Sequence, residues 1–279
     1  MKVKVAKTAG FCFGVKRAVD LVYTQCEESH QVYTYGPIIH NEEVIRDLER
    51  KGVRVINTQD ELMQLETGTV IIRSHGVPKR IYDILTAKDI KVVDATCPFV
   101  RKIHRIVEEC SLEGQDVIII GNDAHPEVEG IKGWCMSNVY VVQSVEDVKD
   151  LTICNDKICV VSQTTFNYKQ YFEIVNAIKG KYSDAYVINT ICNATHERQE
   201  EAISLAKESD VMIVIGGKNS SNTQKLFNIC EKECSNTFYI QKSSDIELEK
   251  IDSDARIGIT AGASTPNNII KEVFDQCQK

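Results

Sequence analysis

Short apolar runs alternate with longer amphipathic stretches along the whole chain. The runs are rich in valine and isoleucine and have the length of strands; they lie at residues 2–6, 31–35, 69–73, 91–94, 116–120, 139–143, 158–162, 185–189, 211–215 and 256–260. Helical spacing of apolar residues follows many of them, for example at residues 14–25, 41–50, 98–110, 194–208, 221–233 and 266–277. Strands that alternate with helices in this way are typical of α/β folds with parallel sheets.

An internal repeat divides the chain into three similar stretches. In each stretch a strand-like run is followed by a cysteine and then by a helical pattern, at Cys12, Cys97 and Cys192. A glycine that ends the next apolar run follows each cysteine by 24 residues, at Gly36, Gly121 and Gly216. Four residues after each glycine a polar residue opens a helical pattern: His40, His125 and Ser220. Three equal spacings predict a threefold repeat of α/β units.

A third element recurs after a further apolar run, as Ser74-His75-Gly76, Gln163-Thr164-Thr165 and Gly262-Ala263-Ser264. Functional groups in open α/β sheets gather beyond the carboxyl ends of the strands, where helices begin. If the three units pack about a pseudo-threefold axis, the three repeated cysteines converge at the centre. The polar residues expected around them are His40, His75, His125, Glu127, Thr164, Thr165, Ser220, Ser221, Asn222 and Ser264. The other histidines, His30, His104 and His196, have no repeated position and are expected to be structural.

The composition is that of a folded, acidic protein. Hydrophobic residues make up 43% and charged residues 26% of the 279 residues, which is enough to bury a core and unlike a disordered or fibrous chain. A net charge of −7 without a basic stripe makes nucleic acid and anionic membranes poor partners. No apolar run is long enough to span a bilayer, and residues 1–11 alternate like a strand rather than a signal peptide. We therefore expect a cytoplasmic protein.

The chain contains 11 cysteines, an unusually large number. The count is odd and no Cys-x-x-Cys pair occurs, so neither a disulfide framework nor a local zinc or ferredoxin motif is expected. Most of the thiols are expected to serve as small apolar side chains. The three repeated cysteines are different, because three thiolates suit two kinds of metal site. One is zinc with a further ligand, and the other is a [4Fe–4S] cluster in which one iron lacks a protein ligand.

The other repeated residues suit an anion. Histidine, serine, asparagine and threonine donors beside helix N-termini can hold a phosphate without a Walker loop. Ser220, Ser221 and Asn222 could equally cap the following helix, and capping is compatible with anion binding. Glu127, in the segment Ala124-His125-Pro126-Glu127-Val128, is the candidate general acid. An acidic residue is also ordinary in the first turn of a helix, so both interpretations of Glu127 are open.

Together these motifs resemble those of one known family. They are Gly10-Phe11-Cys12, His40-Asn41, Ser74-His75-Gly76, Asp94-Ala95-Thr96-Cys97-Pro98, His125-Pro126-Glu127-Val128, Gln163-Thr164-Thr165, Cys192-Asn193-Ala194-Thr195, Lys218-Asn219-Ser220-Ser221-Asn222 and Ala261-Gly262-Ala263-Ser264. The chain resembles the IspH/LytB family of 4-hydroxy-3-methylbut-2-enyl diphosphate reductases, from about residue 2 to residue 277. One departure is Phe13, which is bulkier than the small residue expected after the first cysteine and leaves the local packing there open.

The resemblance implies a fold, a reaction and a set of site residues. The fold would be three pseudo-threefold-related α/β domains, a trefoil with parallel-type sheets around a central iron–sulfur cluster. Its domains would be residues 13–96, 97–192, and 193–279 together with 1–12. The reaction would be the last step of the non-mevalonate isoprenoid pathway, in which the allylic alcohol diphosphate takes up two electrons and protons and loses water. The products would be isopentenyl and dimethylallyl diphosphates.

The resemblance also implies a role for each site residue. Cys12, Cys97 and Cys192 would bind a [4Fe–4S] cluster whose open iron takes the substrate hydroxyl. Glu127 would deliver protons with the help of Thr164, and His125 would lie beside them. The diphosphate would be held by His40, His75, Ser220, Ser221, Asn222 and Ser264, and Thr165 and Thr195 would line the pocket. Electrons would come from an external carrier such as a ferredoxin or a flavodoxin.

Two other functions remain as alternatives on the residues alone. A zinc hydrolase acting on a phosphate ester would use the same three thiolates but would be colourless and redox-inert. An iron–sulfur or redox-sensor binding module would contain a cluster but would have no use for so many anion donors. The reductase hypothesis explains the thiolates, the anion donors and the acid together.

Overall fold

The computed structural model describes residues 2–29, 31–88, 90–246 and 251–278, so that His30 lies outside the described residues. The chain forms two compact units. The first unit contains Met1–Lys16, Ile39–Arg46 and Asn193–Lys279, and the second contains Arg17–Ile38 and Asp47–Cys192. In the described part of the chain, no helix is both long enough and apolar enough to cross a membrane.

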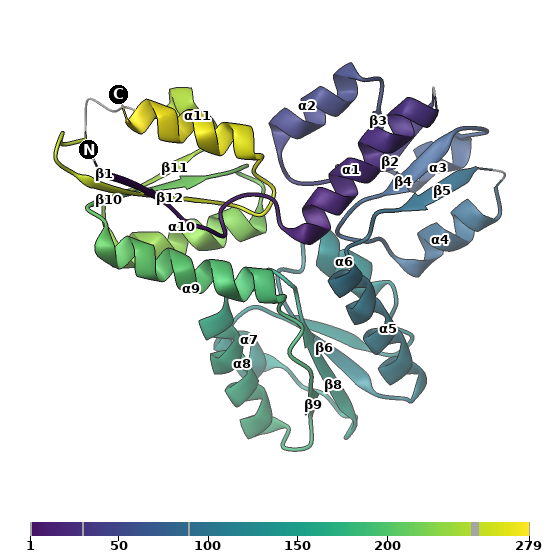
Figure 1. Cartoon of the computed structure of the whole chain (residues 1–279). Coiled ribbons are helices and arrows are strands. Elements are labelled where there is room, and N and C mark those ends of the chain that lie inside the picture. Colours follow the sequence, from purple (N-terminus) through teal and green to yellow (C-terminus); the bar gives the residue numbers. More distant parts are fainter. Residues whose placement is uncertain (1, 30, 89, 247–250, 279) are drawn as a thin grey trace. The chain divides into compact units, whose positions relative to one another are not determined.

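The first unit is built on one four-stranded parallel sheet (Figure 1). The strand order is β1–β12–β10–β11, with bounds Lys2–Val5, Arg256–Ala261, Val211–Ile215 and Thr237–Ile240. Helices α9 (Asn193–Glu208) and α10 (Ser221–Glu233) cover one face, and α11 (Asn267–Cys277) covers the other. Because side chains alternate along a strand, β10 serves both faces: Met212 and Val214 pack with α9 and α10, and Ile213 and Ile215 with α11.

The second unit contains two more four-stranded parallel sheets. One has the order β3–β2–β4–β5, with bounds Arg54–Ile56, Val32–Tyr35, Thr69–Ile72 and Lys91–Asp94. Helices α3 (Gln59–Gln64) and α4 (Lys79–Thr86) pack on it through Leu62, Ile81 and Leu85. Helices α1 (Phe13–Glu28) and α2 (Glu42–Arg50) contain residues of both units.

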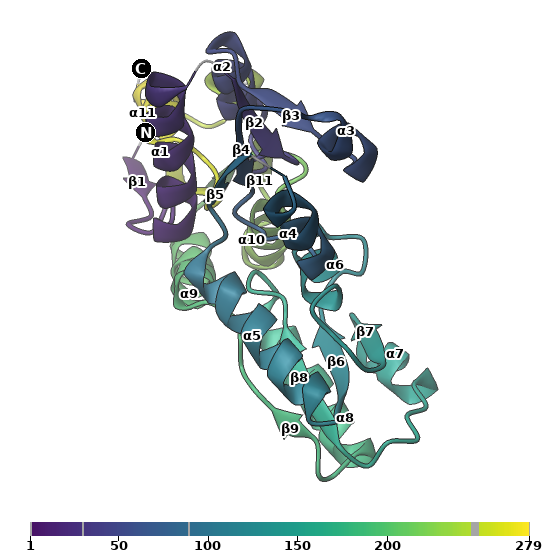
Figure 2. The same ribbon diagram turned by 90° about the vertical axis from the view of Figure 1, so that its right-hand side faces the viewer.

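The other sheet of the second unit has the order β7–β6–β8–β9, with bounds Val139–Val142, Asp116–Ile120, Ile158–Ser162 and Tyr186–Val187. Helices α5 (Pro98–Leu112) and α6 (Pro126–Lys132) bury their apolar residues against one face. Helices α7 (Val145–Asp150) and α8 (Tyr168–Lys181) do so against the opposite face, so that strands β6 and β8 lie between α5 and α8 (Figure 2).

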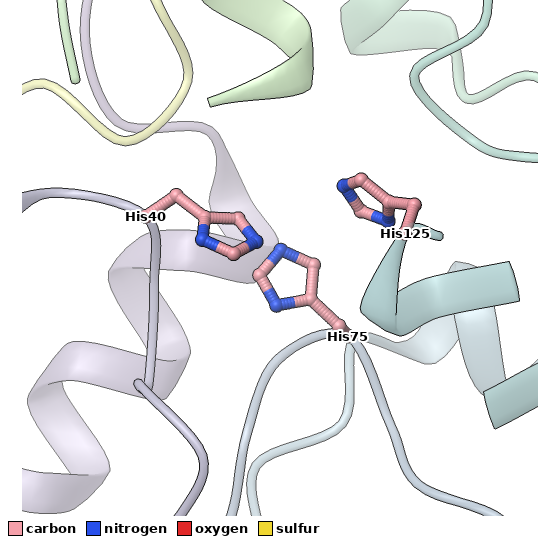
Figure 3. Close-up of side chains that lie close together, drawn as sticks. All are labelled: His40, His75 and His125. Atoms are coloured by element: carbon pink, nitrogen blue, oxygen red, sulfur yellow. The ribbon is translucent and has the colours of Figure 1, made fainter. Parts of the chain in front are cut away.

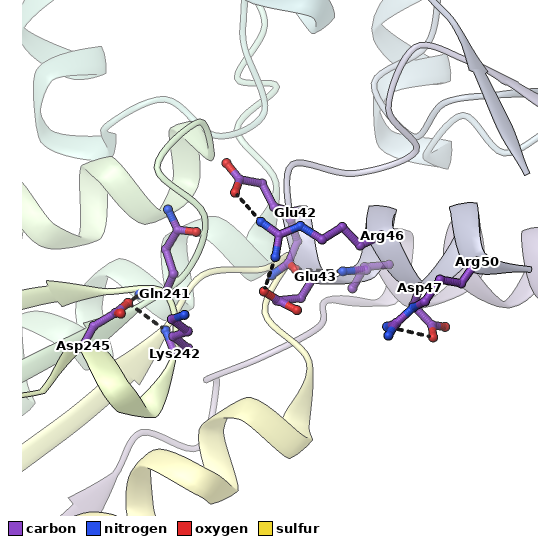
Figure 4. Close-up of polar contacts among 10 residues, drawn as sticks. Glu42, Glu43, Arg46, Asp47, Arg50, Gln241, Lys242 and Asp245 are labelled. Atoms are coloured by element: carbon purple, nitrogen blue, oxygen red, sulfur yellow. Dashed lines mark hydrogen bonds and ion pairs between the residues drawn. The ribbon is translucent and has the colours of Figure 1, made fainter.

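Two polar features of the first unit fix the ends of short elements (Figure 4). Asn41 accepts a hydrogen bond from the backbone N–H of Val44 at 3.2 Å and so caps the start of α2. One turn later, Arg46 lies 3.5 Å from Glu42 and 3.0 Å from Glu43. The 3₁₀ helix η1 (Ser243–Asp245) begins where the Asp245 carboxylate accepts the N–H groups of residues 241 and 242, at 3.0 and 3.1 Å.

The threefold repeat is present in the hydrogen bonds of the backbone. The repeated glycines each donate to the last residue of the adjacent edge strand, at 2.7 Å (Gly36 to Ile56), 2.9 Å (Gly121 to Val142) and 2.9 Å (Gly216 to Ile240). The repeated cysteines each donate to the first or second residue of the third motif, at 3.3 Å (Cys12 to Ala263), 2.9 Å (Cys97 to Ser74) and 3.1 Å (Cys192 to Thr164). A helix begins directly after each cysteine. Equal sequence spacing therefore corresponds to equal local geometry.

Three parallel four-stranded sheets with helices confirm the predicted α/β class. All ten predicted strands are observed, although the one at residues 185–189 is shortened to Tyr186–Val187. Two strands escaped prediction, β3 and β11; both are short edge strands that are only partly buried. Strand β1 pairs with β12, so the N-terminal strand belongs to the sheet of the C-terminal strands. The three domain boundaries stay a prediction.

Candidate active site

A buried carboxylate in the second unit is held on both of its oxygens. Glu127 is 2% exposed and lies in the first turn of α6, after His125 at the N-cap and Pro126 at the first helical position. Its Oε1 accepts the backbone N–H of Thr164 at 2.6 Å, and its Oε2 accepts the Thr164 hydroxyl at 2.8 Å. The His125 Nδ1 atom accepts the N–H of Glu127 at 3.1 Å. The carboxyl group therefore has a fixed position and a hydroxyl in direct contact.

Thr164 also connects this carboxylate to one of the repeated cysteines. Its N–H and its hydroxyl donate to Glu127, while its carbonyl accepts the N–H of Cys192 at 3.1 Å. Three hydrogen bonds around one residue thus join the candidate acid to the backbone of a candidate metal ligand. Thr164 itself is buried, 6% exposed. This arrangement keeps the acid close to the chemistry that Cys192 would support.

Two histidines of the second unit meet edge to face. The rings of His75 and His125 have centroids 5.5 Å apart at an interplanar angle of 79° (Figure 3). His125 begins helix α6, whereas His75 lies in the loop after β4. That loop is fixed at Ser74, whose hydroxyl donates to the carbonyl of Ile38 at 2.9 Å. Ser74 also accepts the N–H of Cys97, so that His75 and this cysteine are positioned by the same residue.

A buried aromatic stack supports the His75 loop. His104, 1% exposed, stacks on Trp134 with centroids 5.2 Å apart, and the Trp134 indole N–H donates to the carbonyl of Val77 at 3.0 Å. Burial lowers the pKa of His104 to about 4, so the ring is neutral near pH 7. His104 was expected to be structural; its contact with this loop is a role that the sequence did not indicate.

The first unit contains a cluster of polar groups at the start of α10. Ser220 is the N-cap of this helix and accepts the N–H of Thr223 at 3.3 Å and its hydroxyl at 2.9 Å. The Ser264 hydroxyl lies 3.1 Å from the carbonyl oxygen of His40 and 3.4 Å from the Ser220 hydroxyl. Hydrogen bonds therefore join His40, Ser220 and Ser264 within this unit.

Three sources of positive potential lie at the start of α10. The amide nitrogen of Asn222 is buried and has no hydrogen-bond partner among the residues that the structure describes. The Lys225 ammonium donates to the Ser221 hydroxyl at 3.1 Å and brings a positive charge to the same helix turn. The N-terminus of a 13-residue helix adds a partial positive charge. A phosphate group here could accept a hydrogen bond from the buried Asn222 amide. It would also be attracted by the Lys225 ammonium and by the N-terminus of α10.

The candidate residues are divided between the two units. The first unit contains Cys12, His40, Thr195, Ser220, Ser221, Asn222 and Ser264, and the second contains His75, Cys97, His125, Glu127, Thr164, Thr165 and Cys192. Thr165 is half-buried and its hydroxyl accepts a hydrogen bond from Gln163 at 3.1 Å, whereas Thr195 is buried in α9. The site assignments as a whole stay predictions.

Two groups of cysteines differ in their surroundings. Five are buried in the described structure, namely Cys110, Cys159, Cys230, Cys234 and Cys277, and all five belong to hydrophobic clusters. Burial raises the pKa of Cys230 to about 12 and also raises that of Cys159, which keeps both as thiols. The three repeated cysteines are only partly buried, and each stands directly before a helix.

Comparison with known proteins agrees with these features. The family model described as LytB protein matches residues 3–278. A 4-hydroxy-3-methylbut-2-enyl diphosphate reductase of Caldanaerobacter subterraneus subsp. tengcongensis is 48% identical over 99% of this chain and 96% of its own length. The enzyme of the same name from Clostridioides difficile is 46% identical over 98% of both chains.

Two solved structures are also similar. One, described as (E)-4-hydroxy-3-methyl-but-2-enyl diphosphate reductase, the terminal enzyme of the non-mevalonate pathway, is 42% identical, with a TM-score of 0.73 over 100% of this chain and 99% of that one. The other, the E-1-hydroxy-2-methyl-but-2-enyl-4-diphosphate reductase from Plasmodium falciparum, is 27% identical, with a TM-score of 0.92 over 100% of this chain and 88% of that one. The chain therefore belongs to the LytB family.

Proposed function

We propose that this chain reduces (E)-4-hydroxy-3-methylbut-2-enyl diphosphate to isopentenyl and dimethylallyl diphosphates, the last step of the non-mevalonate pathway. Full-length relatives that carry this name, at 46–48% identity, support the proposal. The observation that carries it is the hydrogen-bonded series Glu127–Thr164–Cys192, because a reductive dehydroxylation needs an acid close to its source of electrons.

The residues fit a [4Fe–4S] cluster bound by Cys12, Cys97 and Cys192. All three are sulfur donors at helix starts, and the same backbone hydrogen bond holds each of them. The buried cysteines, by contrast, belong to the apolar core. When bound, such a cluster supplies electrons one at a time and, through an iron without a protein ligand, Lewis acidity. An external carrier such as a ferredoxin or a flavodoxin would supply the electrons, and the cytoplasmic location stays a prediction.

The diphosphate would bind to the polar cluster at the start of α10. Ser220, Ser221 and Asn222 offer hydroxyl and amide donors there, Ser264 adds another hydroxyl, and His40 lies within reach of Ser264 through its carbonyl. Donors of this kind are fixed before the substrate arrives, which lowers the entropic cost of binding. His75 and His125 would contribute imidazole donors from the second unit.

Glu127 would deliver a proton to the reacting end of the substrate. In the overall reaction the C–O bond of the allylic alcohol breaks, a C–H bond forms, and the oxygen leaves as water. Two electrons and two protons balance this change. The Thr164 hydroxyl, 2.8 Å from the carboxylate, can pass a proton outward while its backbone N–H keeps the carboxylate in place. Burial of both residues keeps bulk water from competing with this transfer.

The test combines spectroscopy with one pair of variants. Mössbauer spectra of anaerobic, iron-57-labelled protein should show a [4Fe–4S] cluster in which one iron changes when the allylic alcohol diphosphate is added. Properly loaded protein that contains zinc instead of iron would favour the hydrolase. Glu127→Gln should retain the cluster and substrate binding but lose turnover about 100-fold or more. The control is Glu129→Gln on the same helix, whose exposed carboxylate lies 3.5 Å from Arg73 and should matter little. Near-normal turnover of Glu127→Gln would exclude it as the proton source.

A further inference from the structure

Two arginines donate hydrogen bonds to the backbone of the loops that carry two of the repeated cysteines. Arg198, on α9, donates from Nη1 to the carbonyl of Ala261 at 2.6 Å and from Nη2 to the carbonyl of Gly10 at 2.9 Å. Arg17, on α1, donates from Nη1 to the carbonyl of Thr96 at 3.2 Å and from Nη2 to that of Asp94 at 3.1 Å. Each guanidinium therefore bridges two carbonyls that are distant from it in sequence.

Arg198 holds both chain segments on which Cys12 depends. Gly10 lies two residues before Cys12, and Ala261 lies two residues before Ala263, whose carbonyl accepts the Cys12 N–H. Gly10 has a φ of +100°, a conformation that other residues rarely adopt, so this loop is not held by regular secondary structure. Arg198 is 3% exposed, and a buried guanidinium is costly unless its donors are satisfied. The carbonyls of Ala261 and Gly10 satisfy one donor on each of its two terminal nitrogens.

Arg17 does the same for Cys97. Thr96 directly precedes this cysteine, and Asp94 is the last residue of β5. The Asp94 carboxylate in turn accepts the N–H of Thr96 at 2.9 Å and lies 2.8 Å from Arg101 on α5. Two kinds of contact thus fix the segment before Cys97. Arg17 donates hydrogen bonds to its carbonyls, and the Asp94 carboxylate, itself in contact with Arg101, accepts one of its N–H groups.

The side chain of Thr190 attaches the segment before Cys192 to Ser162. The Thr190 hydroxyl accepts the N–H of Ser162 at 2.7 Å and donates to the carbonyl of the same residue at 2.7 Å. Two of the three cysteine loops therefore have a guanidinium bound to their backbone, whereas the third is attached through its own Thr190 side chain to the backbone of Ser162. The difference is in charge as well as in geometry, because a guanidinium is protonated at every pH at which the protein is folded.

We propose that Arg17 and Arg198 are positioning residues that fix the cysteine loops before the cluster is inserted and raise its reduction potential once it is bound. Each lies on the helix that begins directly after a different cysteine, Cys12 for Arg17 and Cys192 for Arg198, so each helix holds the loop of another cysteine. A fixed positive charge near the anionic cluster favours the reduced, more negative state. The redox part rests on the proposed function, whereas the positioning part does not.

The positioning part is tested by amide hydrogen exchange on the full-length chain, anaerobically, before and after cluster reconstitution. In Arg198→Met the amides of residues 10–12 should exchange about tenfold or more faster, the effect of losing one charge-assisted hydrogen bond. The control is Arg256→Met, at the other end of β12, where the arginine pairs with Asp210 on the surface. Exchange at residues 10–12 that is equal in Arg198→Met, Arg256→Met and the unchanged protein would overturn the proposal.

The redox part is tested by titrating the reconstituted cluster while following its electron paramagnetic resonance. The midpoint potential should become more negative in Arg198→Met, stay close to that of the unchanged protein in Arg198→Lys, which keeps the charge, and be unaffected in Arg256→Met. An unchanged potential in Arg198→Met would exclude the electrostatic role. If Arg198→Met does not fold, Arg17→Met makes the same test on the amides of residues 94–97, because Arg17 is only half-buried. A chain that never binds iron would disprove the proposed function and still leave the exchange result to decide the positioning role.

Discussion

At Gly76 a single methyl group should disturb the candidate site. Its φ is +72°, in the left-handed region, and an added Cβ would collide with Cε1 of His104 and lie 3.0 Å from Nε2 of the same ring and 3.2 Å from the methyl group of Thr96. The ring of His104 cannot easily move, because it is buried and stacked on Trp134. Gly76→Ala should therefore displace the loop that carries His75 and, through Thr96, the segment before Cys97.

The size of the effect follows from two separate costs. A non-glycine residue in the left-handed conformation costs about 1–2 kcal/mol. Forcing a methyl group into a packed interior costs about 1–3 kcal/mol more. Gly76→Ala should accordingly lower the free energy of unfolding by about 2–5 kcal/mol. Gly114→Ala, in the same unit, provides the control. Its φ is +79°, but nothing lies within 4 Å of the added Cβ, so its free energy of unfolding should fall only by the cost of the left-handed conformation.

Urea unfolding followed by tryptophan fluorescence measures this difference directly. Trp134 is the single tryptophan of the chain and stacks on the ring that the new methyl group would contact. Gly76→Ala should be less stable than Gly114→Ala by about 1–3 kcal/mol. The pair Gly76→Ala and His104→Ala should also show a coupling energy of about 1 kcal/mol or more in a double-mutant cycle. Equal stability of the two glycine variants would refute the packing argument.

Three further predictions concern pH, the cluster and the anion site. Burial lowers the pKa of His104 to about 4, so near pH 5 the unfolded chain protonates this ring and the folded chain does not. The free energy of unfolding should therefore fall by about 2 kcal/mol between pH 7 and pH 5. Urea titrations at both pH values should show that His104→Phe lacks this decrease. Cys97→Ser should lower the iron bound per chain, measured after reconstitution, whereas Cys154→Ser, at an exposed cysteine, should not; full loading of Cys97→Ser would end the three-thiolate assignment. Asn222→Asp replaces a buried amide donor by a carboxylate of the same shape and should raise the KM for the diphosphate substrate about tenfold or more, and an unchanged KM would remove Asn222 from the anion site.

The features that sequence predicted are those that local pattern or repetition encodes. The apolar runs of the central strands are visible within a few residues, because β4, β6, β8, β10 and β12 are buried along almost their whole length. Cys12, Cys97 and Cys192 each precede a glycine by 24 residues, and each of the three donates the same kind of backbone hydrogen bond. Repetition thus indicated structurally equivalent positions without any knowledge of which segments lie side by side.

The features that escaped prediction depend on contacts between distant segments. Arg198 lies 188 residues from Gly10 and 63 residues from Ala261, and nothing near it in sequence distinguishes it from a surface arginine of a helix. His104 likewise occupies an ordinary position on an amphipathic helix, and only its stacking on Trp134 shows what it supports. Strands β3 and β11 are only partly buried and each pairs with a single neighbour at the edge of its sheet.

The repeat also explains how similar units can differ in chemistry. The residues that accept the hydrogen bond from the three cysteines are Ser74, Thr164 and Ala263, and all three do so through a backbone carbonyl. Since the side chain is not needed for this role, it is free to vary: the Ser74 hydroxyl fixes its own loop, the Thr164 hydroxyl holds Glu127, and Ala263 has no polar group. The backbone geometry at the three cysteines is thus the same, and in the second of the three repeats the Thr164 side chain also binds the carboxylate of Glu127. Replacing Thr164 by valine should accordingly leave the Cys192 amide protected from hydrogen exchange and still slow turnover, because it removes the hydroxyl and leaves the carbonyl in place.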